Sequence, residues 1–329
     1  MVRKTAAQPT AGSETGGNPW PALIAGPIAG LTSRFLFYPG DTVKAQLQVQ
    51  GSLGGPLRYT STRHAVAQIL KAEGLAGFYK GFGAVLVGNV PANMAYFGGY
   101  ELARSKVPGS WGLVGDMCVG AVAQLSGGLL YTPLDVVKER MQVHSLVQGP
   151  GAPRTSSWKV LTSLVQREGP LGLVRGYWVT NAVWIPWSMV HISLYEQAKR
   201  TAVAAGWAGT VVGIQDVDEL SAHAGKAVAH ASETLPAWLL ATCSCAAAVV
   251  ATLITHPFDV VKTRLQVLGG TGTRASAWSV AQSALLREGP RAFGAGAVAR
   301  VVTIAPGSAV SWAIFEPVKS ALEHSAGVL

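Results

Sequence analysis

The sequence contains one heptapeptide pattern three times, as Tyr38-Pro39-Gly40-Asp41-Thr42-Val43-Lys44, as Thr132-Pro133-Leu134-Asp135-Val136-Val137-Lys138 and as His256-Pro257-Phe258-Asp259-Val260-Val261-Lys262. In each copy an aspartate follows the proline by two residues, a lysine by five and a glutamine by nine. Such self-similarity is the sequence signature of a repeat architecture. The chain is therefore predicted to consist of three tandem repeats, each carrying one copy of this Pro-x-Asp-x-x-Lys motif.

Two further patterns recur in step with the motif. A Glu-Gly pair follows each motif proline by 31 to 35 residues, and its glutamates are Glu73, Glu168 and Glu288. Later in each repeat stands an aromatic–glutamate pair with a basic residue three positions on: Tyr100, Glu101 and Arg104; Tyr195, Glu196 and Lys199; Phe315, Glu316 and Lys319. The positions of these recurring patterns predict repeats at 19–108, 109–205 and 235–322, an inserted loop at 206–234, and tails at 1–18 and 323–329.

The composition indicates a membrane protein. Only 13% of the 329 residues are charged, whereas soluble domains carry about 25%, and the mean hydropathy is +0.30. Ranges 81–100, 117–134, 176–195 and 235–255 contain no Asp, Glu, Lys or Arg, and 19–33 and 301–315 are shorter candidates. Because about 20 apolar residues cross a bilayer as a helix, we expect an all-α membrane protein with six transmembrane helices.

The same data disfavour other classes of protein. The net charge is +9, but the basic residues are spread along the chain, so a nucleic-acid partner is not expected. The three cysteines do not suggest a disulfide framework. No phosphate-binding glycine loop, zinc pair or nucleophile elbow is recognised, so an enzyme with a bound cofactor or metal is not expected.

The charges of the motif suit a ring of ion pairs. Its aspartate and lysine are three residues apart, so they share one helix face, and the proline bends the helix. In a threefold bundle each charge can then reach a neighbouring helix. Three such bridges would close one end of the bundle, and the Glu-x-x-Lys/Arg sets would close the other end.

With these motifs the chain resembles the mitochondrial carrier family, over residues 19–322. The resemblance implies a pseudo-threefold barrel of six transmembrane helices with short amphipathic helices on the matrix side. It implies a matrix gate that pairs Asp41 with Lys138, Asp135 with Lys262 and Asp259 with Lys44, braced by Gln48, Gln142 and Gln266. It also implies a cytoplasmic gate that pairs Glu101 with Lys199, Glu196 with Lys319 and Glu316 with Arg104, braced by Tyr100 and Tyr195.

Lipid contacts and location follow from the same resemblance. Lys80-Gly81 and Arg175-Gly176 resemble the cardiolipin sites of the family, whereas the third copy, Ala295-Gly296, lacks the basic residue. We expect a monomeric, multi-pass protein of the mitochondrial inner membrane, although a plastid or peroxisomal membrane stays open.

In this family the substrate is read mainly by even-numbered helices, at positions that correspond here to Gly88, Val183, Trp184 and Thr303. None of them is charged, which argues against di- and tricarboxylates. One cation, Arg34, stands five residues before Pro39, and an arginine within a membrane span is by default a functional candidate. A small neutral, zwitterionic or singly anionic solute is the predicted substrate.

Three alternatives stay open. The stretch from Ile185 to His191 resembles mitoferrin-type iron carriers, although Asn93 stands where a second histidine is expected. Transport of a nucleotide or cofactor is another alternative. The third is an adaptor that has the carrier fold and does not transport.

Overall fold

The structure, a computed structural model, describes residues 20–53, 57–108, 111–149, 155–204, 237–268 and 276–326. Within these ranges each repeat contains a long helix, a short helix, a 3-10 helix and a second long helix. The predicted N-terminal tail and the predicted loop at 206–234 lie outside the described residues. The last long helix runs to Ala326, so the start of the predicted C-terminal tail at 323–329 is helical.

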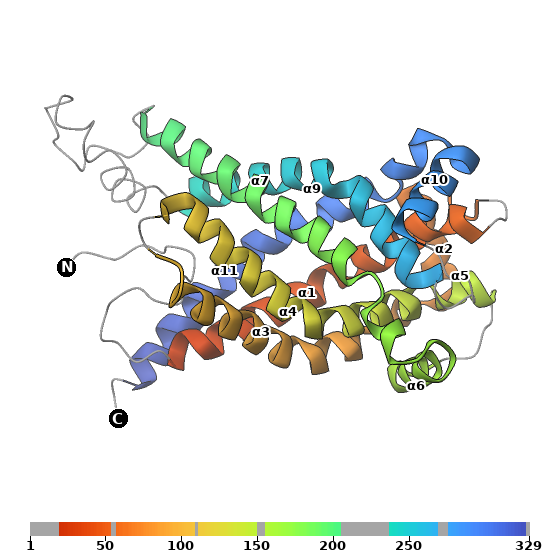
Figure 1. The fold of residues 1–329 in the computed structure, drawn as a ribbon, viewed down its shortest axis with the longest axis horizontal. Coiled ribbons are helices and arrows are strands. Elements are labelled where there is room, and N and C mark those ends of the chain that lie inside the picture. The colour runs from red at the N-terminus through yellow and green to blue at the C-terminus, as the bar shows by residue number, and fades with distance from the viewer. Residues whose placement is uncertain are drawn as a thin grey trace, which may run out of the picture.

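The first repeat consists of α1 (Trp20–Val49), η1 (Gln50–Leu53), α2 (Thr62–Glu73), η2 (Leu75–Tyr79) and α3 (Phe82–Arg104). The second consists of α4 (Gly112–Gln142), α5 (His144–Gln148), α6 (Ser157–Glu168), η4 (Pro170–Val174) and α7 (Tyr177–Ala204). The third consists of α9 (Ala237–Leu268), α10 (Ala277–Glu288), η6 (Pro290–Gly294) and α11 (Ala297–Ala326). The short helices α2, α6 and α10 lie at one end of the molecule, the short-helix end (Figure 1).

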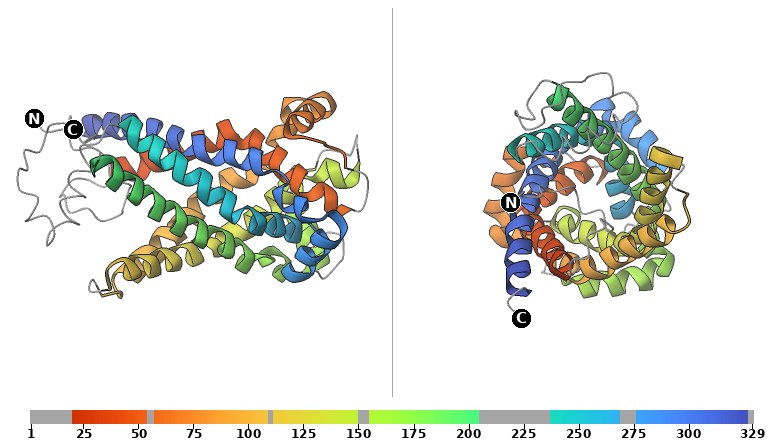
Figure 2. Two further views of the ribbon diagram at one scale, coloured as in Figure 1. Left: turned by 90° about the horizontal axis from the view of Figure 1, so that it is seen from above. Right: turned by 90° about the vertical axis from the view of Figure 1, so that its left-hand side faces the viewer.

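The long helices of the described residues form a closed ring, as the view along the molecule shows (Figure 2). Helix α1 packs against α11 and α3, α4 packs against α3 and α7, and α9 packs against α7 and α11. The start of α1 and the end of α11 both lie at the end opposite the short helices. This arrangement is the pseudo-threefold ring that the repeats predict.

Each short helix begins and ends with the same local signals. The N-caps are Ser61, Ser156 and Ser276, and each side chain accepts a hydrogen bond from the backbone N–H three residues on. Each helix ends at the glycine of the Glu-Gly pair, which has a positive φ between 67° and 75°. Glycine adopts this left-handed conformation without steric cost. The recurring Glu-Gly pair thus marks the end of each short helix.

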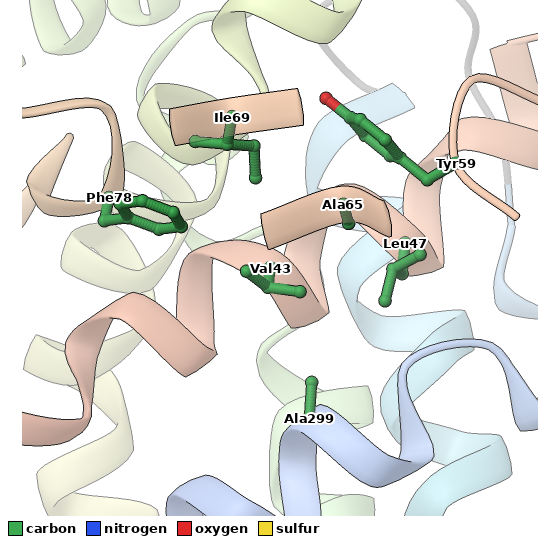
Figure 3. Close-up of a cluster of buried hydrophobic side chains, with 7 residues drawn as sticks. All are labelled: Val43, Leu47, Tyr59, Ala65, Ile69, Phe78 and Ala299. Carbon is green, nitrogen blue, oxygen red and sulfur yellow. The ribbon is translucent and has the colours of Figure 1, made fainter. Parts of the chain in front are cut away.

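The short helices bury one apolar face against the ends of the long helices. In α2 this face consists of Ala65 and Ile69, which are four residues apart and therefore lie on one side of the helix. They join a buried cluster with residues of α1, η2, α11 and the segment before α2 (Figure 3): Val43, Leu47, Phe78, Ala299 and Tyr59. The equivalent buried pairs are Val160 and Leu164 in α6, and Val280 and Ala284 in α10. The short helices are therefore amphipathic, as predicted.

The first long helix of each repeat does not end at its motif. Helices α1, α4 and α9 continue for 10, 9 and 11 residues beyond Pro39, Pro133 and Pro257. A proline removes one backbone donor and bends a helix, but packing against the short helices supports the following turns. The motif aspartates and lysines consequently stand on continuous helix.

Three helical stretches of the described residues are long and apolar enough to cross a membrane by length and composition alone: Met117–Gln142, Trp238–Leu268 and Pro290–Ser311. The other long helices carry more polar residues, such as Asn89 and Asn93 in α3. Large apolar side chains nevertheless lie exposed on α3 and α7, where Val87, Met94 and Trp178 are at least 70% exposed. Such apolar surface suits contact with lipid.

Candidate functional site

Three ion pairs connect α1, α4 and α9, the first long helix of each repeat, near the short-helix end. In each pair, the lysine of one motif meets the aspartate of the preceding motif, and the third motif is joined back to the first. The Nζ–Oδ2 distances are 2.7 Å for Lys138–Asp41, 2.8 Å for Lys262–Asp135 and 2.7 Å for Lys44–Asp259. These are the pairs that the family resemblance implies for a matrix gate. We call them the ion-pair ring.

The three ion pairs are not equally buried. The side chain of Asp259 is 3% exposed, whereas that of Asp41 is 30% exposed. Asp259 Oδ2 also accepts a hydrogen bond from Gln48 Nε2 at 2.8 Å and lies 3.6 Å from Arg300 Nε. A buried charge requires such partners, since its desolvation offsets much of the attraction within the pair.

The three motif glutamines are fully buried but have different partners. Gln48 contacts the ion-pair ring through Asp259. Gln142 Nε2 instead donates to Thr42 Oγ1 at 3.2 Å, and Gln266 Nε2 donates to Thr180 Oγ1 at 3.4 Å. The structure therefore places a glutamine against an ion pair in one of the three predicted positions, and the sequence alone did not indicate the two threonines.

A second ring of contacts lies beyond the first. The residue two positions after each motif lysine donates a side-chain hydrogen bond to the backbone carbonyl of the next helix's motif glutamine. The donor–acceptor pairs are Gln46 Nε2 to Gln142 O (2.9 Å), Arg140 Nε to Gln266 O (3.0 Å) and Arg264 Nε to Gln48 O (2.7 Å). The last carbonyls of a helix lack partners within the helix, so these side chains cap the neighbouring helix. This capping ring was not predicted from the sequence, although the polar residue at this position in every repeat was a signal for it.

The glutamates of the Glu-Gly pairs connect the capping ring to the short helices. Arg140 Nη1 lies 2.6 Å from Glu168 Oε1, and Arg264 binds Glu288 through Nη1 at 2.5 Å and Nη2 at 2.9 Å. In the first repeat Gln46 carries no charge, and Glu73 pairs instead with Lys80 at 2.6 Å.

Arg34 lies on α1 near the ion-pair ring and contacts the neutral side chain of Tyr131 on α4. Its Nη2 donates to Tyr131 Oη at 3.4 Å, and its Cζ lies 5.6 Å from the centre of the Tyr131 ring. Tyr131 Oη donates in turn to Asn89 Oδ1 at 3.1 Å. Among the described residues, Arg34 forms no ion pair. This Arg34–Tyr131–Asn89 chain joins α1, α4 and α3.

The other predicted substrate residues are engaged in packing in this conformation. A Cβ on Gly88 would lie 1.8 Å from Leu134 Cδ1, so Gly88 faces α4 closely, and Val183 is fully buried. Trp184 is half-buried and meets the Trp187 ring edge-on at 5.7 Å. Thr303 Oγ1 donates to Ala299 O at 2.8 Å and lies against Gly40 of α1. Their role as substrate contacts stays a prediction.

The residues predicted for a cytoplasmic gate lie at the end opposite the short helices. Glu101 and Arg104 are exposed there, Tyr100 is half-buried, and Lys199 Nζ lies 4.8 Å from the centre of the Tyr195 ring. The side chains of Glu196, Glu316 and Lys319 lie outside the described residues. This gate also stays a prediction.

The profile of the family described as "Mitochondrial carrier protein" matches the chain three times, at 16–111, 109–205 and 233–326. The chain belongs to the mitochondrial carrier family. It is 31% identical to mitochondrial substrate carrier family protein E of Dictyostelium discoideum, over 90% of this chain and 94% of the relative. It is 28% identical to the mitochondrial S-adenosylmethionine carrier protein of Danio rerio, over 92% and 97%, and 27% identical to the mitoferrin of Dictyostelium discoideum, over 92% and 94%.

This carrier therefore has the all-α membrane fold of a family whose members are solute transporters, not enzymes, of mitochondrial membranes. His191, noted for its mitoferrin-like surroundings, stacks at 4.9 Å on Trp187, and its Nε2 lies 3.4 Å from Ser244 Oγ. Among the described residues, no three His, Cys, Asp or Glu side chains gather in a way that could hold a metal ion. In this conformation His191 packs α7 against α9.

The predicted cardiolipin residues lie at the start of α3 and before α7. Gly81 and Gly176, which directly precede α3 and α7, have positive φ values of 82° and 83°. Lys80 pairs with Glu73, and Arg175 Nη1 lies 2.8 Å from Glu168 Oε2. Lipid binding at these sites stays a prediction.

Proposed function

We propose that this carrier moves a small neutral, zwitterionic or singly anionic solute across the mitochondrial inner membrane by alternating access. The observation that carries the proposal is Arg34, a cation within a membrane helix that contacts neutral groups and forms no ion pair among the described residues. One such cation can balance one negative charge of a solute. The predicted contacts Gly88, Val183, Trp184 and Thr303 add no charge.

The position of Arg34 supports a substrate site close to the ion-pair ring. Arg34 precedes Asp41 by seven residues, or two turns, so both lie on one face of α1, about 10 Å apart along the axis. Tyr131 precedes Asp135 by one turn of α4 in the same way. A solute that draws Arg34 or Tyr131 toward itself therefore acts next to the residues that hold the helices together.

In the proposed mechanism, the short-helix end faces the matrix and the ion-pair ring is the closed matrix gate. Because desolvation offsets much of the energy of buried ion pairs, the ring can open when substrate binds more tightly to another conformation. The predicted pairs Glu101–Lys199, Glu196–Lys319 and Glu316–Arg104 would form as the ring opens. Each side would then be accessible in turn.

Iron is the second candidate substrate, because the chain is similar to a mitoferrin over most of its length. Iron transport would require ligands to gather in a conformation other than this one. S-adenosylmethionine also enters the test, since a relative is named for it.

The proposal is tested with purified carrier in a thermal-shift screen of small solutes, followed by uptake into liposomes. Zwitterionic or singly anionic solutes should raise the melting temperature, and the active ones should be taken up. Arg34→Gln should reduce their uptake about tenfold or more, the effect of losing a charge-assisted hydrogen bond. Lys71→Gln, at an exposed position of α2, is the matched control. Stabilisation by di- or tricarboxylates alone would contradict the proposal, and stabilisation by ferrous iron would favour the second candidate.

The gate is tested separately by exchanging charges. Asp135→Lys should abolish uptake, and combining it with Lys262→Asp should partly restore it, because the exchanged pair can form again at the observed 2.8 Å contact. The mismatched combination with Lys138→Asp is the control. If no solute is taken up by the wild-type chain, the adaptor alternative is favoured instead.

A further inference from the structure

A partly enclosed cavity of about 210 Å³ lies at the short-helix end, between α5, α6 and the ends of α4 and α9. Its charged and titratable lining consists of Arg140, His144, Arg167 and Glu168. The cavity is formed by other residues than the Arg34–Tyr131–Asn89 chain, and the transport mechanism above does not use it.

The lining has an excess of positive charge. Glu168 is the only carboxylate among the lining residues, and both of its oxygens already have cationic partners, Arg140 at 2.6 Å and Arg175 at 2.8 Å. Arg167 lies on the last turn of α6 and is exposed. Two guanidinium groups line the cavity, those of Arg140 and Arg167, and Glu168 pairs with only the first of them.

Arg140 has an unused donor beside this cavity. Its Nε donates to Gln266 O and its Nη1 to Glu168, whereas its Nη2 is buried and has no hydrogen-bond partner. A buried donor without a partner is unfavourable, because it has lost its hydrogen bonds to water. In the third repeat the equivalent Arg264 uses all three nitrogens, on Gln48 O and on both oxygens of Glu288.

The corresponding side chains of the other two repeats have different neighbours. In the first repeat Tyr59 is 3% exposed, packs with Ala65 and Ile69, and donates its hydroxyl to Gln46 Oε1 at 2.7 Å. Glu288 of the third repeat lies so close to Gly51 of η1, in the first repeat, that a Cβ on Gly51 would be 1.8 Å from the carboxylate. The second repeat therefore combines space, positive charge and an unpartnered guanidinium nitrogen.

We propose that this cavity binds a small oxyanion of the phosphate class. Arg167 can reach one oxygen of such an anion, and a rotation of the Arg140 guanidinium group, whose Nη2 is buried in this conformation, would bring Nη2 to another. Such contacts are short and strong for phosphate. The volume is below the range of about 300–1,000 Å³ typical of sites for larger ligands. Inorganic phosphate or the phosphate of a lipid headgroup therefore fits better than a nucleotide.

Binding of an anion would also affect the capping ring. Arg140 holds the Gln266 carbonyl at the end of α9, so an anion that fixes its guanidinium group strengthens the contact between α4 and α9. A ligand that binds this conformation stabilises it by mass action. Anion binding in this cavity would therefore stabilise the conformation in which the short-helix end is closed.

The test measures the melting temperature of the purified full-length carrier in detergent free of cardiolipin. Inorganic phosphate is titrated against potassium chloride of equal ionic strength, and a saturable rise of about 2–4 °C is expected. Arg167→Gln should weaken the apparent phosphate affinity about tenfold or more. Arg287→Gln is the matched control, because Arg287 occupies the same place on α10, is exposed, and does not line the cavity.

A second arm replaces phosphate with added cardiolipin and uses the same three proteins. A phosphate shift that is lost in Arg167→Gln and kept in Arg287→Gln supports the site with a free anion as its ligand. A cardiolipin shift with that pattern, in the absence of a phosphate shift, supports the site with a lipid headgroup as its ligand. If neither reagent gives a shift that depends on Arg167, the proposal is wrong.

Discussion

The first and third repeats bring the same motif to the short-helix end but support it differently. Asp259 of the third repeat is 3% exposed and contacts Lys44, Gln48 and Arg300, whereas Asp41 of the first is 30% exposed. Arg264 is bound to a carboxylate and a carbonyl, whereas its counterpart Gln46 is neutral. Identical spacing in the sequence therefore yields unequal interactions, because burial determines how costly a lost partner is.

The largest difference is expected between Asp259→Asn and Asp41→Asn. The first change leaves Lys44 and Arg300 without their buried counter-charge and should reduce the free energy of unfolding by about 3–5 kcal/mol. The second removes a more exposed charge and should cost about 1.5–3 kcal/mol. Thermal unfolding of the purified carrier measures both. Equal losses would show that the exposure difference does not matter.

The next difference is expected between Arg264→Gln and Gln46→Ala. Arg264→Gln leaves Glu288 without its cation and should cost about 3 kcal/mol. Gln46→Ala removes neutral hydrogen bonds and should cost about 1–2 kcal/mol. The same unfolding measurement applies. A larger loss for Gln46→Ala would mean that the capping contact is stronger than the arginine–glutamate pair.

A steric change in α1 tests how closely the first repeat meets the third. A Cβ on Gly40 would lie 2.3 Å from Thr303 Oγ1, so Gly40→Ala should destabilise the carrier by about 1–3 kcal/mol. Thr303→Ala in the same chain should restore most of this loss. Gly30→Ala is the control in the same helix, because nothing lies within 4 Å of the added Cβ. A failure of Thr303→Ala to rescue would place the clash elsewhere.

The smallest effect concerns Tyr59, which packs against α2 in the first repeat. Tyr59→Phe removes the 2.7 Å hydrogen bond to Gln46 Oε1 and should cost about 1 kcal/mol. In a Gln46→Ala background the same change should have almost no effect, since its partner is gone. A double-mutant cycle of unfolding free energies measures this coupling, and additive losses would argue against a direct interaction.

The sequence predicted most of the fold and the partners in the ion-pair ring. Three copies of one motif in phase require three equivalent helix pairs, and charges three residues apart on a helix point in one direction. The pairing of Asp41, Asp135 and Asp259 with particular lysines followed from the family resemblance, and the bounds of the short helices were not predicted. The continuation of α1, α4 and α9 beyond their prolines did not follow, because it depends on packing against the short helices.

The tertiary structure alone decided which equivalent positions are equally stabilised. Gln142 and Gln266 meet threonines instead of the ion pairs, Gly88 and Val183 are buried by neighbouring helices, and Arg140 keeps a nitrogen that Arg264 uses. These outcomes depend on which residues pack beside each position, such as Tyr59 beside Gln46 and Gly51 beside Glu288. Periodicity along a chain specifies direction and spacing, whereas burial is a collective property of the packed molecule. The chain thus encodes a threefold pattern, and its packing makes the three parts unequal.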